Sequence, residues 1–296
     1  MAYNPLRNSY NKRSPRLNKE DYAAKKKAEK DEMFEDVEAS LSDIKADDGV
    51  FMYYLDTQAR FDRYSAINAL LISRQFEGAT QLKEFNEWIE MGVKVKKGEK
   101  AISILEPVPY TDGNGVEKVG YNVKKLFDIS QTSAEPAPAP PLASDTKAFV
   151  VALVNSSPIK KVKVEQLPNN INDSAAYFDD KQNVLYIKKN EAPTRLFQDV
   201  ARELALSEIA YHSDTFTRSE NIDAAKCTAY MLCKKYGIDT KGIVLGGMPS
   251  EWKGLESKDL RLQLTMARDS LNTVSNRVYT EINKERERAT PEHTRS

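Results

Sequence analysis

A proline- and alanine-rich run near the middle of the chain, from Glu135 to Pro141, most constrains how the protein can fold. Such a run is extended and semi-rigid, and its side chains cannot build a core. The chain has 296 residues, more than one minimal domain needs, so the run is expected to join two modest domains. We place this linker at residues 133–147, and the periodicity on both sides indicates α+β structure.

The charges cancel overall but are arranged in blocks. Lys plus Arg number 44 and Asp plus Glu number 44, which excludes a uniformly cationic binder, so any nucleic-acid surface must be local. Residues 1–27 carry eight cations against two acids, whereas residues 28–49 carry nine acids against two lysines. Residues 1–49 are therefore expected to form a polar arm, disordered at first and loosely helical later. The basic part of the arm is either solvated or in contact with phosphates.

Two observations bear on the compartment. No stretch approaches the roughly 20 apolar residues that a membrane helix needs, and the opening residues lack the apolar core of a secretory signal. We therefore expect a cytoplasmic protein without a membrane partner. Cys227 and Cys233 lie six residues apart in a predicted helix and point in different directions, which predicts reduced thiols.

Hydrophobic periodicity predicts a first domain at 50–132, a second at 148–245 and a C-terminal helical segment at 246–296. In the first domain, Asp112-Gly-Asn-Gly115 is a strong hairpin signal. The predicted helices are 57–76, 82–91, 194–211, 222–236 and 258–288, and the predicted strands are 93–96, 101–108, 119–129, 148–154 and 175–187, the last with a turn at 179–183. The apolar stripe of the last helix fits packing on the second domain or on a partner.

Cations and aromatic residues are interleaved in the first domain in a way that suits an unpaired nucleic-acid strand. Lys and Arg bind phosphates, and aromatic rings stack on bases for about 1 to 3 kcal/mol per base. Residues 50–130 contain eleven cations and eleven acids, so a basic patch requires the fold to separate them. For Trp88, Phe85 and Phe127, a place in the hydrophobic core is the alternative. The candidate DNA-binding residues are Arg60, Arg63, Tyr64, Asn68, Arg74, Trp88, Lys94, Lys96, Lys97, Lys100, Tyr121, Lys124 and Lys125.

Four motifs of this domain occur in a distinctive order: Phe61–Ile72, Phe85–Gly92, Val95–Lys100 and Leu126–Thr132. Together they resemble the N-terminal single-stranded DNA-binding domain of ArdC-type antirestriction proteins. The lysine-glycine-glutamate-lysine turn and the closing phenylalanine-aspartate-x-x-glutamine segment are the most specific parts. The resemblance implies a cytoplasmic protein of a plasmid, phage or integrative element in a bacterial host cell, which binds incoming single-stranded DNA.

The resemblance continues beyond the linker. Residues 175–187 resemble the strand pair before the zinc helix of the family's metallopeptidase domain, and residues 226–239 resemble its later helix. The family motif, His-Glu-x-x-His, places two imidazoles one helical turn apart, with the glutamate as general base for a zinc-bound water. This chain has Arg202-Glu-Leu-Ala-Leu206 instead, and the family's third ligand position falls at Lys226.

Arginine and leucine offer no lone pair to a metal, so the resemblance implies a degenerate, zincin-like domain. The degenerate metal-site positions are Arg202, Glu203, Leu206 and Lys226, and we expect no metal, no cofactor and no catalytic residue. Arg202 is expected to pair with Glu203 or Asp223 in place of the metal charge. Glu208 and His212, four residues apart, are expected to make a surface interaction rather than a metal site.

The sequence thus predicts a sequence-nonspecific single-stranded DNA-binding protein of a mobile element or phage, with an accessory role in antirestriction, DNA transfer or replication. We expect no enzyme activity. Two alternatives stay open. One is a metallopeptidase with an atypical site, and the other is an adaptor that binds a replication, transfer or restriction protein through its C-terminal half.

Overall fold

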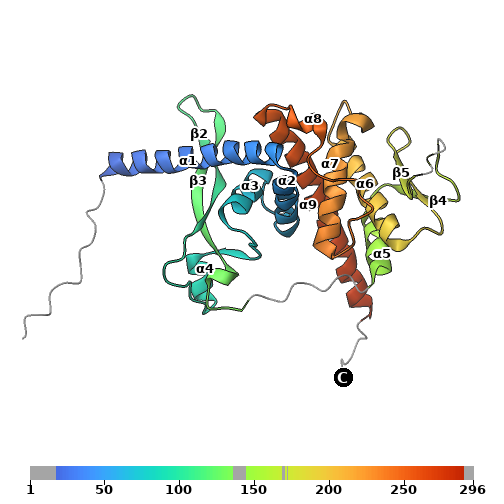
Figure 1. The fold of residues 1–296 in the computed structure, drawn as a ribbon, viewed down its shortest axis with the longest axis horizontal. Helices are drawn as coiled ribbons and strands as arrows, with labels where there is room; N and C mark the ends of the chain where they lie inside the picture. Colours follow the sequence, from blue (N-terminus) through green and yellow to red (C-terminus); the bar gives the residue numbers. More distant parts are fainter. Residues whose placement is uncertain (1–17, 136–144, 169–170, 172, 290–296) are drawn as a thin grey trace, which may run out of the picture.

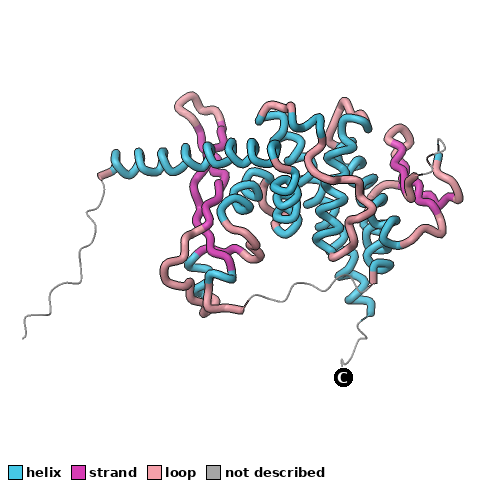
Figure 2. Tube along the Cα trace, in the orientation of Figure 1, coloured by secondary structure: helices cyan, strands magenta, loops and turns pink. Residues whose placement is uncertain are grey.

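The computed structural model describes residues 18–135, 145–168, 171 and 173–289. The fold class is α+β, as predicted, with two small three-stranded sheets and helices between them (Figures 1 and 2). One sheet comes from the N-terminal half of the chain and the other from the C-terminal half, and they lie at opposite ends of the helical layer. Among the described helices, none combines the length and apolar character needed to cross a lipid bilayer.

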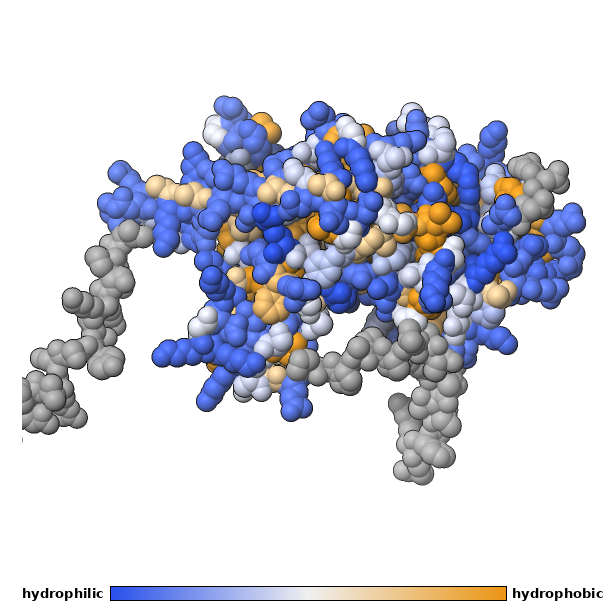
Figure 3. Space-filling view, in the orientation of Figure 1, coloured by the Kyte–Doolittle hydropathy of each residue, from blue (hydrophilic) through white to orange (hydrophobic). Residues whose placement is uncertain are grey.

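Helix α1 (Lys19–Ala46) is capped at its N-terminus by Asn18, whose side chain accepts a hydrogen bond from the Asp21 N–H. Its visible surface is mostly hydrophilic (Figure 3), but a narrow apolar stripe at three- and four-residue steps is buried in the core. The expected helical character is confirmed for 19–46, but the expectation of a polar arm is wrong for 33–46, where the stripe packs into the core. The many charges around the stripe made it hard to recognise in the sequence. Residues 1–17 lie outside the described residues. The buried stripe consists of Met33, Val37, Leu41 and Ile44.

The helix predicted at 57–76 is in fact two helices, α2 (Asp48–Arg60) and α3 (Ala66–Gln75). The break occurs because Ser65 has extended backbone angles and its hydroxyl caps α3 by accepting from the Asn68 N–H over 3.2 Å. A side-chain signal for a helix start thus lay inside an otherwise continuous apolar pattern.

The first sheet is antiparallel, with strand order β1-β3-β2. The predicted hairpin is confirmed: the Asp112 carboxylate accepts hydrogen bonds from the N–H groups of Asn114 and Val116. The helix predicted at 82–91 is shorter, because its first residues form β1, and the strand predicted at 93–96 is only an isolated bridge. The elements are β1 (Leu82–Glu84), α4 (Phe85–Glu90), β2 (Ile102–Thr111), β3 (Glu117–Asp128) and the 3-10 helix η1 (Ile129–Gln131).

In the C-terminal half, the strand predicted at 148–154 is wrong, because this apolar run belongs to helix α5 (Thr146–Ser156). Asp145 caps α5 by accepting from the Ala148 N–H, and a short apolar run alone does not distinguish a buried strand from a buried helix. The predicted strand pair at 175–187 and the helices at 194–211, 222–236 and 258–288 are confirmed. The remaining elements are β4 (Lys160–Val164), β5 (Ala176–Asp179), β6 (Val184–Lys188), α6 (Pro193–Tyr211), α7 (Arg218–Tyr236), α8 (Ser250–Lys253) and α9 (Ser257–Ala289).

The hydrophobic core continues from one half of the chain into the other. The apolar stripe of α9 is buried in it from Leu260 to Val278, and α2 packs against α7. Polar contacts follow the same interface: Tyr230 Oη donates to Asp56 Oδ1 over 2.8 Å, and Lys234 forms an ion pair with Asp56. The two halves are thus joined by buried contacts as well as by the linker, of which residues 136–144 lie outside the described residues.

The two cysteines behave as predicted. Cys227 and Cys233 are both buried on α7 and form no disulfide. Burial raises the pKa of both thiols above their ordinary value, since a thiolate would lose its hydration.

Candidate nucleic-acid interface

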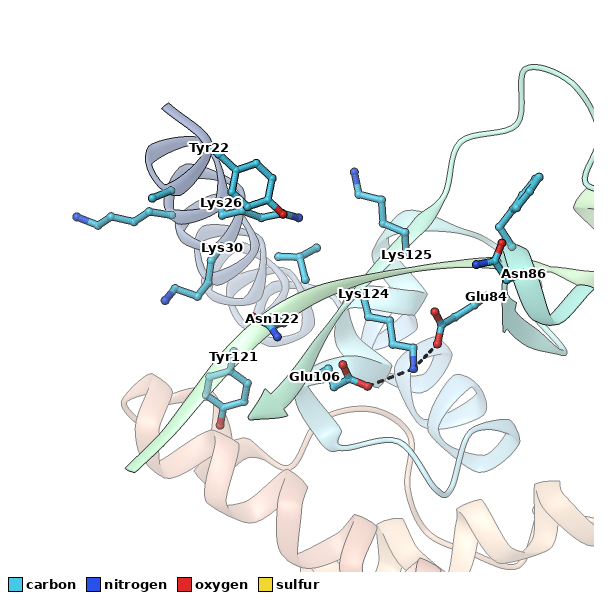
Figure 4. A pocket seen from close by; sticks show the side chains of 14 residues that line it. Tyr22, Lys26, Lys30, Glu84, Asn86, Glu106, Tyr121, Asn122, Lys124 and Lys125 are labelled. Carbon is cyan, nitrogen blue, oxygen red and sulfur yellow. Dashed lines mark hydrogen bonds and ion pairs between the residues drawn. The ribbon is translucent and has the colours of Figure 1, made fainter. Parts of the chain in front are cut away.

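A groove of about 830 Å³ opens between helix α1 and strand β3 (Figure 4). We call it the α1–β3 groove. One wall is the N-terminal part of α1, the other is the middle of β3, and the start of α4 closes one end. Its lining residues are Tyr22, Ala23, Lys26, Lys27, Lys30, Glu84, Phe85, Asn86, Glu106, Tyr121, Asn122, Val123, Lys124 and Lys125.

The local structure explains why these side chains meet. On α1, Tyr22, Lys26 and Lys30 follow one another at four-residue steps, so they share one face of the helix. On the opposite wall, β1 pairs only with the last residues of β3, Leu126 to Asp128. The preceding part of β3 has no strand partner on that side among the described residues, so side chains from both of its faces reach the groove.

Three half-exposed aromatic rings line the groove. Tyr22 is 56% exposed, Phe85 49% and Tyr121 37%. The Tyr121 ring packs edge-to-face with Phe34, at 5.7 Å between centroids, and the Phe85 ring packs in the same way with Phe127, at 6.2 Å. These contacts fix two of the rings while leaving much of their surface for unpaired bases to stack on.

Five lysines line the same groove, and three of them form ion pairs with acidic residues. Glu29 lies between two lysines, with Oε2 2.9 Å from Lys26 Nζ and Oε1 2.9 Å from Lys125 Nζ. Lys124 Nζ lies 2.6 Å from Glu84 and 3.2 Å from Glu106 (Figure 4). Lys27 and Lys30 form no ion pair with any described residue.

The ionisation of these groups follows from their contacts. Hydrogen bonds from Lys125 and Lys26 hold the pKa of Glu29 below its ordinary value. The hydrogen bond to Glu84 is the largest cause that raises the pKa of Lys124, to about 12, and Glu106 adds to it. Glu29 and Lys124 therefore both stay charged at neutral pH.

Only three of the residues proposed from the sequence line this groove: Tyr121, Lys124 and Lys125. Tyr64 and Asn68 line a smaller cavity of about 300 Å³, which Lys124 also borders. Asn68 is buried and serves the fold, because its side-chain amide exchanges two hydrogen bonds with the backbone of Leu105.

Three other proposed residues are engaged in contacts that stabilise the fold. Trp88 is 1% exposed and its Nε1 donates to the Phe127 carbonyl, so it belongs to the core, the alternative considered for it. Arg60 donates to the Ala79 carbonyl, and Arg74 forms ion pairs with acids of α1.

The remaining cations do not converge on the groove. Lys94, Lys96, Lys97 and Lys100 are exposed in the loop between α4 and β2, where Lys96 donates to the Ser130 carbonyl. Arg63 lies in the turn between α2 and α3, against α9. Arg63, Lys96 and Lys124 are thus not gathered in one groove, because spacing along a sequence does not determine which faces of a folded domain adjoin.

Sequence reasoning did not place the α1 side of the groove in the binding site. Tyr22, Lys26, Lys27 and Lys30 belong to the segment interpreted as a polar arm. The available signal was the excess of cations in residues 1–27, which fitted either a solvated arm or contact with phosphates.

A second candidate site lies where the sequence resembles a zinc-binding helix. The carboxylate of Glu203 is completely buried on α6. It accepts hydrogen bonds from Arg202 Nε over 3.0 Å, Arg218 Nη2 over 2.6 Å and the Phe178 N–H over 2.9 Å. The predicted pair between Arg202 and Glu203 is confirmed, whereas Asp223 pairs with Lys226.

These residues do not fit a metal. Arg202 and Lys226 are cations that border a cavity of about 530 Å³, Leu206 is buried, and both oxygens of Glu203 face hydrogen-bond donors. Among the described residues, no three His, Cys, Asp or Glu side chains are grouped so that they could hold a metal ion.

The expected surface interaction between Glu208 and His212 is wrong, because Glu208 pairs with another residue. Glu208 is buried and accepts hydrogen bonds from both terminal nitrogens of Arg277 on α9. The arginine is 69 residues away in the sequence, so helical spacing gave no indication of it.

Comparison with known proteins finds a matching domain family for part of this chain. Residues 26–129 match the family model described as the N-terminal domain of the anti-restriction factor ArdC. The match begins in α1 and ends at Ile129, so it includes most of both walls of the α1–β3 groove. An uncharacterized protein of Bacillus anthracis, pXO2-81, is 25% identical over 289 residues, covering 78% of this chain and 48% of the relative. The chain therefore spans about half the length of that curated relative.

Two crystal structures of the antirestriction protein ArdC from the R388 plasmid are also similar. The metal-free structure is 16% identical, with a TM-score of 0.45, over 73% of this chain and 86% of that one. The Mn(II)-bound structure is 14% identical, with a TM-score of 0.49, over 74% of this chain and 84% of that one.

Proposed function

We propose that the ArdC-type N-terminal domain at residues 26–129 binds single-stranded DNA in the α1–β3 groove, without sequence preference. The observation that carries the proposal is the meeting of five lysines with three half-exposed rings in one groove. Ammonium groups attract phosphates irrespective of sequence, and aromatic rings stack on any unpaired base. In a duplex the base faces are covered, so the rings would gain little from it.

Fluorescence anisotropy with labelled oligothymidine, and with a duplex of the same length, tests the proposal. Tyr22→Ala and Lys30→Ala remove one ring and one cation from the groove. Their matched controls, Tyr279→Ala and Lys258→Ala, change exposed residues of α9. We expect Tyr22→Ala to weaken single-strand binding by about fivefold or more, and the controls to leave it unchanged.

Two results would contradict the proposal. One is equal affinity of the wild-type protein for single strand and duplex. The other is an affinity of Tyr22→Ala and Lys30→Ala that equals the affinity of their controls, which would place the DNA outside the groove.

We assign to this binding an accessory role in antirestriction, or in the transfer or replication of DNA, for a plasmid or phage in the cytoplasm of a bacterial cell. The name of the matched domain supports this role. The test is the efficiency with which unmodified DNA enters a restricting host that expresses the protein, compared with a host that expresses Tyr22→Ala. Equal efficiency with both would separate DNA binding from antirestriction.

We further propose that the C-terminal half has no peptidase activity. The support is Glu203, whose carboxylate faces two guanidinium groups where a metallopeptidase would present a general base to a metal-bound water. Metal analysis of the purified protein tests this. Stoichiometric zinc that is lost in Glu203→Ala would instead favour the metallopeptidase.

A further inference from the structure

We infer that Lys26 and Lys125 form a phosphate subsite of the α1–β3 groove, and that the carboxylate of Glu29 occupies this subsite until DNA displaces it. The inference rests on the proposed function and deepens it, because it assigns the position of one phosphate and a competitor built into the protein.

The geometry of the three residues carries the inference. Each oxygen of Glu29 contacts one ammonium group, and both distances are 2.9 Å. Lys26 comes from α1 and Lys125 from β3, so the carboxylate connects the two walls of the groove. A phosphodiester also carries one negative charge shared by two oxygens on one atom, so it can make the same pair of contacts.

Lys124, the third lysine of the groove with an ion pair, is excluded as the exchange position by its surroundings. Lys124 contacts two carboxylates, Glu84 of β1 and Glu106 of β2, so its surroundings carry a net negative charge. A phosphate entering there would meet the second carboxylate even after displacing the first. Lys124 therefore joins the strands of the sheet, and the exchange is confined to Glu29.

Displacement of Glu29 is feasible because its ion pairs are at the surface. The side chain of Glu29 is 21% exposed, and those of Lys26 and Lys125 are 47% and 58% exposed. Exposed ion pairs are weak and are screened by salt. A DNA strand, in contrast, brings neighbouring phosphates to Lys27 and Lys30 and bases to the rings, so the incoming phosphate is supported by further contacts.

The consequence is a specific effect on salt dependence. With Glu29 ionised, the subsite has a net charge of one, since two ammonium groups oppose one carboxylate. In Glu29→Gln, the two positive charges of Lys26 and Lys125 both remain available to the DNA backbone. The slope of log affinity against log salt changes by about 0.7 to 0.9 for each phosphate contact on a single strand or a duplex. We therefore expect Glu29→Gln to steepen the slope by about 0.7 on oligothymidine and to tighten binding at low salt by about three- to tenfold.

Glu32→Gln is the matched control. Glu32 is exposed on the same helix, makes no ion pair with a described residue, and its replacement changes the net charge of the protein equally. The experiment measures the affinity of wild type, Glu29→Gln and Glu32→Gln for labelled oligothymidine between about 50 and 200 mM salt. Glu32→Gln is expected to stay within about twofold of wild type, with an unchanged slope.

A second pair of variants distinguishes direct competition from a loosened helix. If Glu29 competes for the subsite, most of the gain from Glu29→Gln disappears in a Lys125→Met background, where the subsite is lost. A gain that persists in full in that background would overturn the inference, and so would equal affinity of Glu29→Gln and Glu32→Gln. These failures are distinct from failure of the proposed function, which would appear as wild-type protein that does not bind single-stranded DNA at low salt.

Discussion

Arg218 donates a hydrogen bond over 2.6 Å to Glu203, at the position where the segment resembling a zinc helix would hold its general base. Arg218 begins α7 and also lies over the ring of Tyr177, 4.9 Å from its centroid. Together with Arg202, it supplies the positive charge that a buried carboxylate requires. The guanidinium groups of Arg202 and Arg218 thus stabilise the Glu203 carboxylate in this chain.

Arg218→Met is expected to lower the free energy of unfolding by about 1 to 3 kcal/mol, because Glu203 then retains only Arg202 and one backbone donor. Urea denaturation measures the loss. Arg195→Met is the control, since Arg195 is more exposed and its nearest carboxylate contacts are 3.8 and 3.9 Å long. An equal loss in both variants would mean that the contact with Glu203 contributes nothing specific.

We expect the free energy of unfolding to fall in acid because Asp128 becomes protonated. Although burial opposes its ionisation, backbone N–H groups of Thr80, Ser130 and Gln81 and the Ser130 hydroxyl hold its pKa below the ordinary value. A lowered pKa in the folded state means that the unfolded chain binds the proton first as the pH falls. The stabilisation is therefore complete well above pH 4 and is lost from about pH 5 downward.

Asp128→Asn should accordingly be less stable than wild type at pH 7, and should lose less further stability between about pH 5 and pH 3. Chemical denaturation at a series of pH values provides the comparison. Parallel pH dependences of the two proteins would show that another group accounts for the acid sensitivity.

Removal of the N-terminal part of α1 should weaken DNA binding strongly without unfolding the protein. A chain that begins at Asp31 lacks one wall of the groove, but it keeps the buried stripe from Met33 to Ile44. We expect single-strand affinity to fall by about tenfold or more, with little change in the unfolding midpoint. A chain that begins at Asn18 is the control and should bind normally. If both shortened chains bind equally, the α1 side of the groove is not part of the site.

The continuous core predicts that both halves unfold in one transition. Trp88 lies in the N-terminal half and Trp252 in the C-terminal half, and both are buried. Replacing either one by phenylalanine leaves a single reporter. Trp88 follows the N-terminal half, and Trp252, which packs against Phe51 of α2, follows the interface of the two halves, while circular dichroism follows the whole chain. We expect coincident urea midpoints in each variant. Two separated transitions would show that the halves are energetically independent.

Sequence patterns predicted three of the long helices and one hairpin well. Helices α6 and α9 combine length with clear periodicity, α7 is long, and Asp112-Gly-Asn-Gly115 is a turn sequence typical of the β2–β3 hairpin. Short or mixed signals failed. The run that forms α5 is apolar on all sides, so it could not be told from a strand, and the buried stripe of α1 is outnumbered by charges.

The sites were only partly predictable, for a physical reason. The pair of Arg202 and Glu203 joins adjacent residues and could be anticipated, but the contact with Arg218 depends on how α6 packs against α7. In the same way, Lys125 was proposed from the sequence, whereas the α1 residues on the opposite wall of the groove could be identified only from the structure. Contacts between distant segments depend on tertiary packing, which periodicity does not encode.

The position of α9 has a consequence for how the molecule is made. Arg268 donates to the carbonyls of Arg63 and Tyr64, and Ser275 donates to Asp62, so the turn that separates α2 from α3 relies on a helix more than 200 residues later. During translation the front portion therefore stays incomplete until the ribosome has released α9. A premature stop before Leu260 would remove the contacts that support this turn, although every residue of the α1–β3 groove had already been synthesised.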